Sequence, residues 1–212
     1  MREKILVVAG GEIISPDLIR AEWPFHDKFI AVDGGGNRLH QLGLVPDTLV
    51  GDLDSISPEV LKDWTGKVTV QAYPVEKDET DLELALVCAA GYGAHEASIL
   101  GASGSRLDHT LANFGLLVTA SRLGMRARLV FPGGEARLAG QDKSFNLNMG
   151  DLVSLIPLSP EVKGITTKGL KYPLRNESLF MGKTRGVHNE VCGHPVEVTV
   201  HEGWLVCFIY RL

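Results

Sequence analysis

The sequence has few cysteines, no excess of basic charge and no long apolar run. Its 212 residues include three cysteines, Cys88, Cys192 and Cys207, which form an odd and widely spaced set. This set lacks the spacing of a zinc site or a disulfide framework, so we expect reduced thiols and a cytoplasmic protein. The net charge of −5 excludes the bulk basic field on which nucleic-acid binding depends.

The longest apolar runs have only the length of a β-strand. Ile5–Ala9 is an example, and no run approaches the ~20 apolar residues of a membrane helix. The run is also too short for a signal peptide, and it stops at Gly10-Gly11 instead of a small-residue cleavage site. We therefore expect no membrane segment. With 44% hydrophobic residues, the chain can form a substantial core.

Strand-like and helix-like segments alternate over the first 131 residues. Strands are expected at Lys4–Ala9, Phe29–Val32, Thr48–Val50, Val68–Gln71, Ala97–Leu100 and Arg126–Phe131. Helices are expected after the Ser15-Pro16 and Ser57-Pro58 caps, and over Asn37–Leu42, Asp78–Tyr92 and Leu107–Leu123. This alternation predicts an α/β domain whose parallel sheet is covered by helices on both faces.

The pattern changes from residue 132 onward, where helical periodicity ends. Short alternating segments separated by turns are found at Phe145–Leu147, Leu152–Ile156, Ile165–Thr167, Val196–Val200 and Leu205–Tyr210. They predict a small all-β domain, a sandwich or a barrel. We therefore divide the chain into an α/β domain over residues 1–131 and an all-β domain over residues 132–212.

Carboxylates or glycines follow four of the expected strands. In chain order they are Asp33 with Gly34, then Asp52 and Asp54, then Asp78 and Asp81 with Lys77 and Thr80, and finally Asp108 and His109 with Gly101, Ser103, Gly104, Ser105 and Arg106. Each group alone is also explained as turn formers or helix-start residues. Together they point to one edge of the sheet, because ligands bind beyond the carboxyl ends of parallel strands.

Carboxylates gathered at one edge repel one another unless a cation lies among them. A set of oxygen ligands suits Mg²⁺, which binds one or two carboxylates, water and usually substrate phosphates. The glycines of "DGGGN" and "GASGSR" allow backbone amides to approach such phosphates, and Arg106 and Lys77 can pair with phosphate oxygens. The residues therefore predict a site for Mg²⁺ and a polyphosphate.

Six segments resemble a known family. "DGGGN", "GDLDSI", "KDETDLELAL", "GSRLDHTLANF", "TKGLKYPL" and "HNEVCGHPVEV" are similar in order and approximate spacing to the thiamine pyrophosphokinase family. The resemblance covers nearly the whole chain. It implies an α/β nucleotide-binding domain followed by a β-sandwich, in a homodimer that binds thiamine at the subunit interface. It also implies transfer of a pyrophosphoryl group from ATP to the hydroxyethyl group of thiamine, with release of AMP.

The resemblance assigns roles to individual residues. Asp52, Asp54 and Asp81 are expected to bind Mg²⁺. The ATP and metal pocket is expected to be lined by Asp33, Gly34, Lys77, Asp78, Thr80, Ser103, Arg106, Asp108, His109 and Asn113. Among these, Lys77 and Arg106 would stabilise charge during transfer, and Asp81 and Asp108 are candidates for the general base.

Three residues of the all-β domain are expected to contact thiamine. Tyr172 of "GLKYPL" occupies a position where the family often has an aromatic residue that stacks on thiamine, and a flat ring suits a cationic thiazolium. Asn189 matches the last motif. His188 departs from it, because family members commonly carry serine there.

Two other functions remain open from the sequence. One is a Mg²⁺-dependent phosphatase that would form a covalent phosphate on Asp52, since "DLDSI" resembles the Asp-x-Asp start of the aspartyl-phosphate enzymes. The other is a sensor that binds thiamine or a nucleotide without turnover. The dense carboxylate set argues against the sensor, because a protein that only binds ATP gains little from several negative charges.

Overall fold

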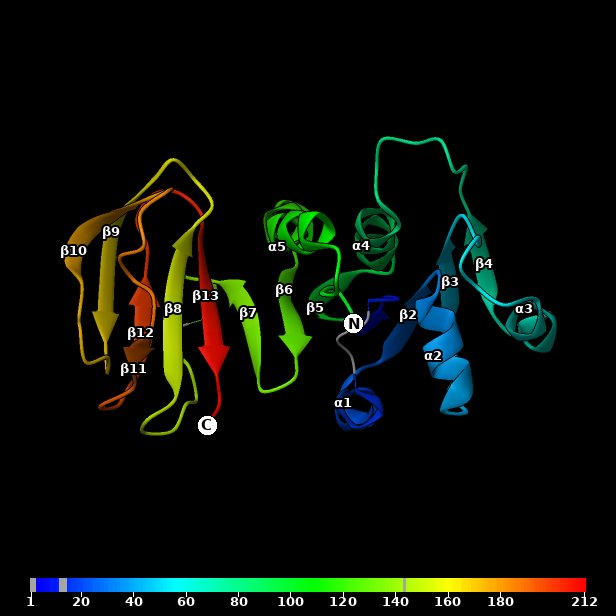
Figure 1. Cartoon of the computed structure of the whole chain (residues 1–212), viewed down its shortest axis with the longest axis horizontal. Helices are drawn as coiled ribbons and strands as arrows, with labels where there is room; N and C mark the ends of the chain where they lie inside the picture. The colour runs from blue at the N-terminus through cyan, green and yellow to red at the C-terminus, as the bar shows by residue number, and fades with distance from the viewer. Residues whose placement is uncertain (1–2, 12–14, 143) are drawn as a thin grey trace. The chain divides into compact units, whose positions relative to one another are not determined.

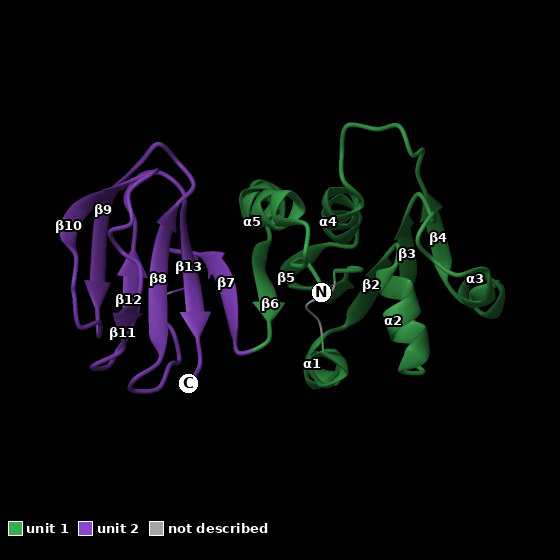
Figure 2. Ribbon diagram, in the orientation of Figure 1, with its two compact units in different colours: residues 1–132 green, residues 133–212 purple. Residues whose placement is uncertain are grey.

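Two units make up the computed structural model, residues 1–132 and residues 133–212 (Figure 2). The structure describes residues 3–11, 15–142 and 144–212. Unit 1 contains all the α-helices of this described part and unit 2 contains strands only.

Six parallel strands form the sheet of unit 1 (Figure 1). They are β1 (Glu3–Val8), β2 (Lys28–Val32), β3 (Thr48–Gly51), β4 (Thr69–Ala72), β5 (Ala94–Leu100) and β6 (Arg126–Phe131). Their order is β6-β5-β1-β2-β3-β4. The chain therefore builds outward from β1 in one direction and then returns to its other side with β5. The point between β1 and β5 is the switch point at which open parallel sheets bind ligands.

Helices cover both faces of this sheet. They are α1 (Pro16–Glu22), α2 (Gly35–Gln41), α3 (Pro58–Trp64), α4 (Asp81–Gly91) and α5 (Leu107–Arg122), with a short 3-10 turn, η1 (Trp23–Phe25). Figure 1 shows α4 and α5 on one face, and α1, α2 and α3 on the other. The α/β prediction is confirmed. No helix in the described part of the chain is long and apolar enough to cross a membrane.

The start of α4 differs from the prediction. The helix begins at Asp81 instead of Asp78, because Thr80 adopts an extended backbone and its hydroxyl accepts a hydrogen bond from the Glu83 amide. Asp78 therefore lies outside the helix, and the predicted start of this helix at Asp78 is wrong. Asp81 is instead the first helical residue.

Successive side chains of each strand point to opposite faces of the sheet, and together they form the core of unit 1. Leu6 and Val8 of β1 point toward α1–α3, where they join a cluster that includes Leu39 and Trp64. The neighbouring residue Ile5 is also fully buried, which is expected of a parallel sheet covered on both faces. This packing fixes the strand ends, and with them the loops that follow.

A polar network ties the segment after α1 to β5 and β6. His26 Nε2 lies 2.8 Å from Ser98 Oγ, and its Nδ1 lies 2.7 Å from the carbonyl oxygen of Glu22. Because that carbonyl can only accept, Nδ1 carries the proton and Nε2 accepts from Ser98. Arg128 donates to Ser98 Oγ at 3.0 Å and pairs with the Glu22 carboxylate. Burial lowers the pKa of His26 below its ordinary value, so the ring is held neutral.

Unit 2 contains two antiparallel sheets. One comprises β7 (Gly134–Leu138), β8 (Leu152–Pro157), β11 (Asn189–Glu190) and β13 (Leu205–Tyr210), and the other comprises β9 (Glu161–Lys168), β10 (Arg175–Phe180) and β12 (Glu197–Thr199). Side chains of both sheets share one buried cluster, in which Leu155 and Cys207 meet Val162 and Ile165. This arrangement confirms the β-sandwich.

Two features of unit 2 differ from the prediction. Phe145–Leu147 is not a strand, since Phe145 forms only an isolated bridge to Val196. Strands β7, β10 and β11 were not expected from the sequence. Strand β10 reads "RNESLF" and has a single buried residue, Leu179, so it lacks the alternation that identifies a half-buried strand.

Candidate functional site

The carboxyl ends of the strands in unit 1 surround a cleft of about 580 Å³. Its lining comes from the loops after β1, β2, β3 and β5, together with the segment before α4 and the start of α5. All lining residues belong to unit 1. A volume of this size accommodates a nucleotide-sized ligand.

Glycines bring the loops around the cleft close together. A Cβ atom on Gly35 would lie 2.1 Å from the carbonyl oxygen of Val8, and one on Gly11 would lie 2.2 Å from that of Gly101. The loops after β1, β2 and β5 can therefore approach one another only through glycine. A side chain at Gly35 or Gly11 would project into this backbone, so glycine at both positions sets how closely the loops around the cleft can pack.

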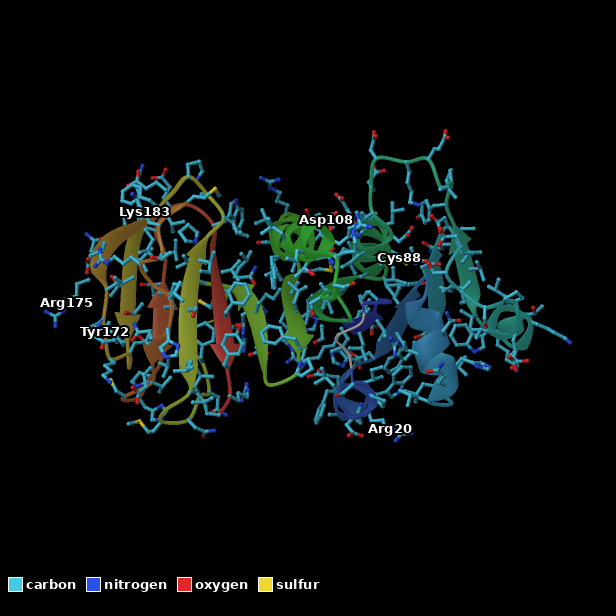
Figure 3. The ribbon with its side chains drawn as sticks, in the orientation of Figure 1. Arg20, Cys88, Asp108, Tyr172, Arg175 and Lys183 are labelled. Atoms are coloured by element: carbon cyan, nitrogen blue, oxygen red, sulfur yellow. The ribbon has the colours of Figure 1, made fainter. Side chains whose placement is uncertain are left out.

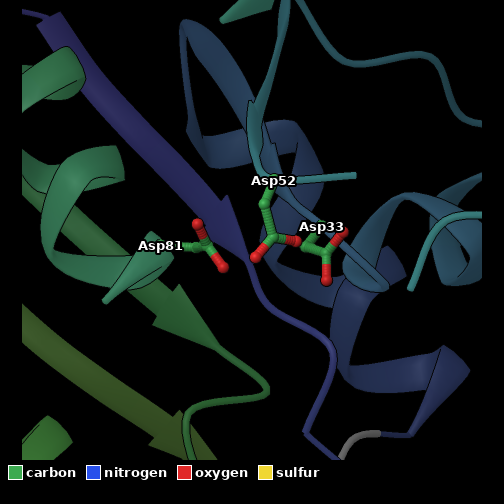
Figure 4. A group of neighbouring side chains, drawn as sticks. All are labelled: Asp33, Asp52 and Asp81. Carbon is green, nitrogen blue, oxygen red and sulfur yellow. The ribbon is translucent and has the colours of Figure 1, made fainter. Parts of the chain in front are cut away.

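Three carboxylates converge in the cleft. Asp33, Asp52 and Asp81 each offer an oxygen atom, and these atoms all lie within 4.8 Å of one another. Figure 4 shows the three carboxylates turned toward one another. Asp33 follows β2 in a left-handed conformation with φ of 43°, Asp52 follows β3, and Asp81 begins α4. Residues far apart in the sequence thus meet because their strands end at the same edge.

The Lys77 ammonium lies against two of these carboxylates. Its Nζ is 3.1 Å from Asp81 Oδ1 and 3.6 Å from Asp52 Oδ2, and it donates to the Pro74 carbonyl at 2.9 Å. Asp81 Oδ1 is buried and accepts no hydrogen bond from the described residues, so the ion pair with Lys77 is the contact that offsets its burial. One cationic group of the chain thus lies where a metal ion would compete for the same oxygens.

The three carboxyl groups are not electrostatically equivalent. Burial raises the pKa of Asp33, and the charges of Asp54 and Asp52 add to this shift, against hydrogen bonds from Ser55. A hydrogen bond from the Asp54 amide lowers the pKa of Asp52, and Lys77 lowers it further. Burial lowers the pKa of Lys77, but its interactions with the Asp81 and Asp52 carboxylates outweigh burial and raise it.

This donor set fits a hard divalent cation. Carboxylate oxygens alone compose it, and Asp81 Oδ1 is a buried oxygen that still lacks a hydrogen bond. Such ligands suit Mg²⁺, which retains waters and binds substrate phosphates at its other positions. Asp33, Asp52 and Asp81 could hold the ion, with Asp33 occupying the place in the group for which the sequence predicts Asp54.

The remaining predicted residues of unit 1 divide into two sets. The cleft is lined by Asp33, Gly34, Asp52, Asp54, Lys77, Thr80, Asp81, Ser103, Arg106, His109 and Asn113. Asp54 is exposed and its carboxylate accepts from the Ser55 hydroxyl at 2.7 Å. Asp78 and Asp108 are exposed and do not line the cleft. Asp108 instead accepts two hydrogen bonds from Arg106, at 3.0 and 2.7 Å, and this pairing holds its pKa well below the usual range.

The loop before α5 is held by the helix that follows it. Asn113 donates to the Ala102 carbonyl at 2.7 Å, and the Thr110 hydroxyl accepts from the Gly104 amide at 3.3 Å. Arg106 belongs to the same loop. Asn113 therefore orients the loop as well as lining the cleft.

Sequence reasoning missed several residues of the site, among them Glu79, Thr110 and Asn37. Glu79 and Thr110 line the cleft. Asn37 of α2 donates to the Ser55 carbonyl at 2.8 Å and accepts from the Ser57 amide at 2.9 Å, so it fixes the loop that carries Asp52. The asparagine that ends "DGGGN" was the available signal for Asn37. Nothing in the sequence distinguishes Glu79 from an ordinary exposed acid.

The three predicted residues of unit 2 lie close together. Tyr172 is at the surface of the unit (Figure 3), with 65% of its area exposed. Asn189 is buried, and its carboxamide bonds to the backbone of Tyr172 at both ends. His188 is exposed, has φ of 59°, and donates its amide to Ser154 Oγ at 2.9 Å.

Comparison with known proteins identifies the family. The profile described as thiamin pyrophosphokinase, catalytic domain, matches residues 19–129, and that described as thiamin pyrophosphokinase, vitamin B1 binding domain, matches residues 141–205. The chain is 34% identical to thiamine pyrophosphokinase of Bacillus subtilis (strain 168), over 88% of this chain and 89% of that protein. The chain belongs to the thiamine pyrophosphokinase family.

Solved structures of the family share the fold. Thiamine pyrophosphokinase from Bacillus subtilis superposes with a TM-score of 0.83 at 27% identity, over 99% of this chain and 100% of that chain. Thiamin pyrophosphokinase from Geobacillus thermodenitrificans superposes with a TM-score of 0.80 at 29% identity, over 99% and 98%. The resemblance noted in the six sequence motifs is thus confirmed at the level of the family and of the fold.

Proposed function

We propose that this protein transfers a pyrophosphoryl group from ATP to thiamine, giving thiamine diphosphate and AMP. The observation that carries the proposal is the convergence of Asp33, Asp52 and Asp81 in a cleft lined by glycine-rich loops, in a chain that also matches the family's vitamin B1 binding domain. The thiamine hydroxyl oxygen forms a bond to the β-phosphorus of ATP. The bond from that phosphorus to the oxygen bridging the α-phosphate breaks, and AMP leaves with this oxygen.

The residues of the cleft have distinct roles in this proposal. Asp33, Asp52 and Asp81 would hold Mg²⁺, with Asp54 beside them as the sequence predicts. When bound, the ion neutralises charge on the phosphate oxygens. Peptide groups of the glycine-rich loops and the side chains of Ser103, His109 and Asn113 accommodate the nucleotide. Lys77 and Arg106 stabilise negative charge at the transferring group, as fixed cations do in phosphoryl transfer.

The hydroxyl proton of thiamine needs an acceptor. Asp81 lines the cleft, whereas Asp108 is exposed outside it and is bound by the guanidinium of Arg106. A carboxylate whose pKa is held low is a poor base, because the charged form is stabilised. We therefore favour Asp81 over Asp108 as the general base.

Recognition of thiamine is assigned to Tyr172, with His188 and Asn189 beside it. Tyr172 offers an exposed flat ring, which suits stacking on the cationic thiazolium or the pyrimidine.

We further propose a homodimer in the cytoplasm. Leu107 and Leu111 on α5 support the dimer, since they are 77% and 72% exposed and form an apolar strip that a second copy could cover. Light scattering coupled to gel filtration tests it.

The deciding assay incubates the protein with ATP, Mg²⁺ and thiamine and separates the nucleotides. We expect AMP and thiamine diphosphate in equal amounts. Formation of ADP would instead indicate transfer of one phosphate. Release of inorganic phosphate without thiamine, with a covalent phosphate on Asp52, would favour the phosphatase. Binding without any product would favour the sensor.

Variants of the acidic residues test the site. Asp52→Asn is expected to lower kcat at least 100-fold, since it removes a carboxylate of the convergent group, while the thermal unfolding temperature is retained. Asp54→Asn is expected to have a smaller effect, because Asp54 lies outside that group. Asp63→Asn, an exposed carboxylate on α3, serves as the control. Near-normal turnover of Asp52→Asn would contradict the assignment.

A further inference from the structure

A single buried side chain binds both backbone groups of Tyr172. Asn189 is 6% exposed and lies in β11. Its Oδ1 accepts a hydrogen bond from the Tyr172 amide at 3.0 Å, and its Nδ2 donates to the Tyr172 carbonyl at 2.8 Å. Oδ1 also accepts from the amide of Glu190 at 3.1 Å. The carboxamide thus pairs with the peptide backbone as a neighbouring strand would.

This pairing replaces a regular strand ladder. Tyr172 lies between β9 and β10 in a bend that belongs to neither strand. On one side of it, the Lys171 amide donates to the Glu190 carbonyl at 2.9 Å, and the two side chains form an ion pair at 3.1 Å. Asn189 itself is anchored by its pairing with Val153 of β8. The backbone of Tyr172 is therefore fixed to the body of the sandwich through Asn189.

The ring of Tyr172 is nevertheless left open. The residue as a whole is 65% exposed, whereas Phe180 is 47% exposed, Phe145 is 5% exposed and Trp204 is half-buried. Tyr172 is thus the most exposed aromatic residue among the described residues of the matched vitamin B1 binding domain. A fixed backbone under an exposed ring limits the positions that the ring can adopt before any ligand arrives.

We infer that Asn189 is a positioning residue, which acts on thiamine binding by holding Tyr172 in place. This inference rests on the proposed function. A ring that is already placed loses less conformational freedom on binding a flat partner, so preorganisation strengthens the contact. The buried carboxamide of Asn189 bonds to the backbone of Tyr172, so Asn189 affects the affinity for thiamine indirectly, through the position of Tyr172.

The test is a double-mutant cycle. Asn189→Ala is expected to raise the KM for thiamine about 3- to 10-fold, as loss of one ordered side chain predicts. The kcat and the KM for ATP should change less than about 2-fold, because unit 1 keeps its cleft. In a Tyr172→Ala background, Asn189→Ala should cause no further loss in kcat/KM for thiamine. A role limited to folding would not depend on the residue at position 172.

Two further variants serve as controls for the interpretation of Asn189→Ala. Asn189→Asp keeps the volume and both accepted hydrogen bonds but can no longer donate to the Tyr172 carbonyl, so we expect a rise in the thiamine KM even if Asn189→Ala fails to fold. Asn146→Ala removes an exposed asparagine of the same unit and should leave all constants unchanged.

Three outcomes would overturn the inference. They are an unchanged thiamine KM in both Asn189 variants, an undiminished effect of Asn189→Ala in the Tyr172→Ala background, and a parallel loss of kcat and of both KM values. These outcomes are distinct from failure of the proposed function, which would appear as a wild-type protein that forms no AMP with thiamine.

Discussion

Gly35→Ala should disable the site through a single methyl group. The Cβ atom would lie 2.1 Å from the Val8 carbonyl oxygen and 2.8 Å from its carbon, whereas real Cβ contacts essentially never fall below 3.0 Å. The contact is with backbone in the central strand β1, which cannot rotate away as a flexible side chain would. The start of α2 must therefore move.

The size of the effect follows from the displacement. Moving α2 by about 0.9 Å shifts Asp33 and Gly34 by a similar distance, and misplacement of about 1 Å costs roughly 100-fold in rate. Overpacking of this kind costs about 1–3 kcal/mol of folding free energy. For a chain of this size the thermal unfolding temperature should fall by about 2–12 °C. The assay is AMP formation from ATP, Mg²⁺ and thiamine, alongside thermal unfolding.

Gly115→Ala is the matched control. Gly115 lies inside α5, and a Cβ atom there would meet nothing within 4 Å. Alanine in a helix interior is favoured over glycine by about 0.5–1 kcal/mol, so this variant should be as active as the wild type and slightly more stable. If Gly35→Ala matched Gly115→Ala in rate and stability, the argument from close backbone approach would be refuted.

Two further predictions concern charge. The Lys77→Met variant should bind Mn²⁺ more tightly than the wild type in the absence of nucleotide, because no ammonium competes for Asp52 and Asp81. Its turnover should nevertheless fall. Weaker or unchanged Mn²⁺ binding in electron paramagnetic resonance titrations would contradict this. The lowered pKa of His26 means that the unfolded chain takes up its proton first, so the free energy of unfolding should decline as pH falls below 6.5. In urea titrations between pH 7.5 and pH 5, His26→Gln should flatten this decline, and an unchanged slope would exclude His26 as its source.

The architecture of unit 1 could be predicted from the sequence because it depends on local residue patterns. Ser15 and Ser57 cap helices that begin with proline, and both helices occur where these residues predict them. The strands are apolar because the sheet is buried on both faces. The rule that ligands bind at strand ends then brings Asp52 and Asp81 together without any further knowledge of the fold.

What the sequence could not predict depends on backbone geometry at the ends of elements. The left-handed backbone conformation of Asp33 turns its carboxylate toward Asp52, and no residue pattern predicts this conformation. The cap at Thr80 delays α4 and leaves Asp78 outside, although aspartate at either position looks alike in sequence. In unit 2, the pairing of Asn189 with Tyr172 joins residues 17 positions apart, which requires the completed sandwich.

The close approach of backbone at Gly11 and Gly35 has a consequence for how this binding site can diversify. Neither residue can acquire a side chain without displacing the neighbouring backbone, so these positions cannot be used to change which nucleotide the cleft accepts. Variation must come from lining residues that carry side chains, such as Glu79 and His109. Mutational libraries aimed at altered nucleotide selectivity should therefore spare Gly11 and Gly35 and randomise such positions.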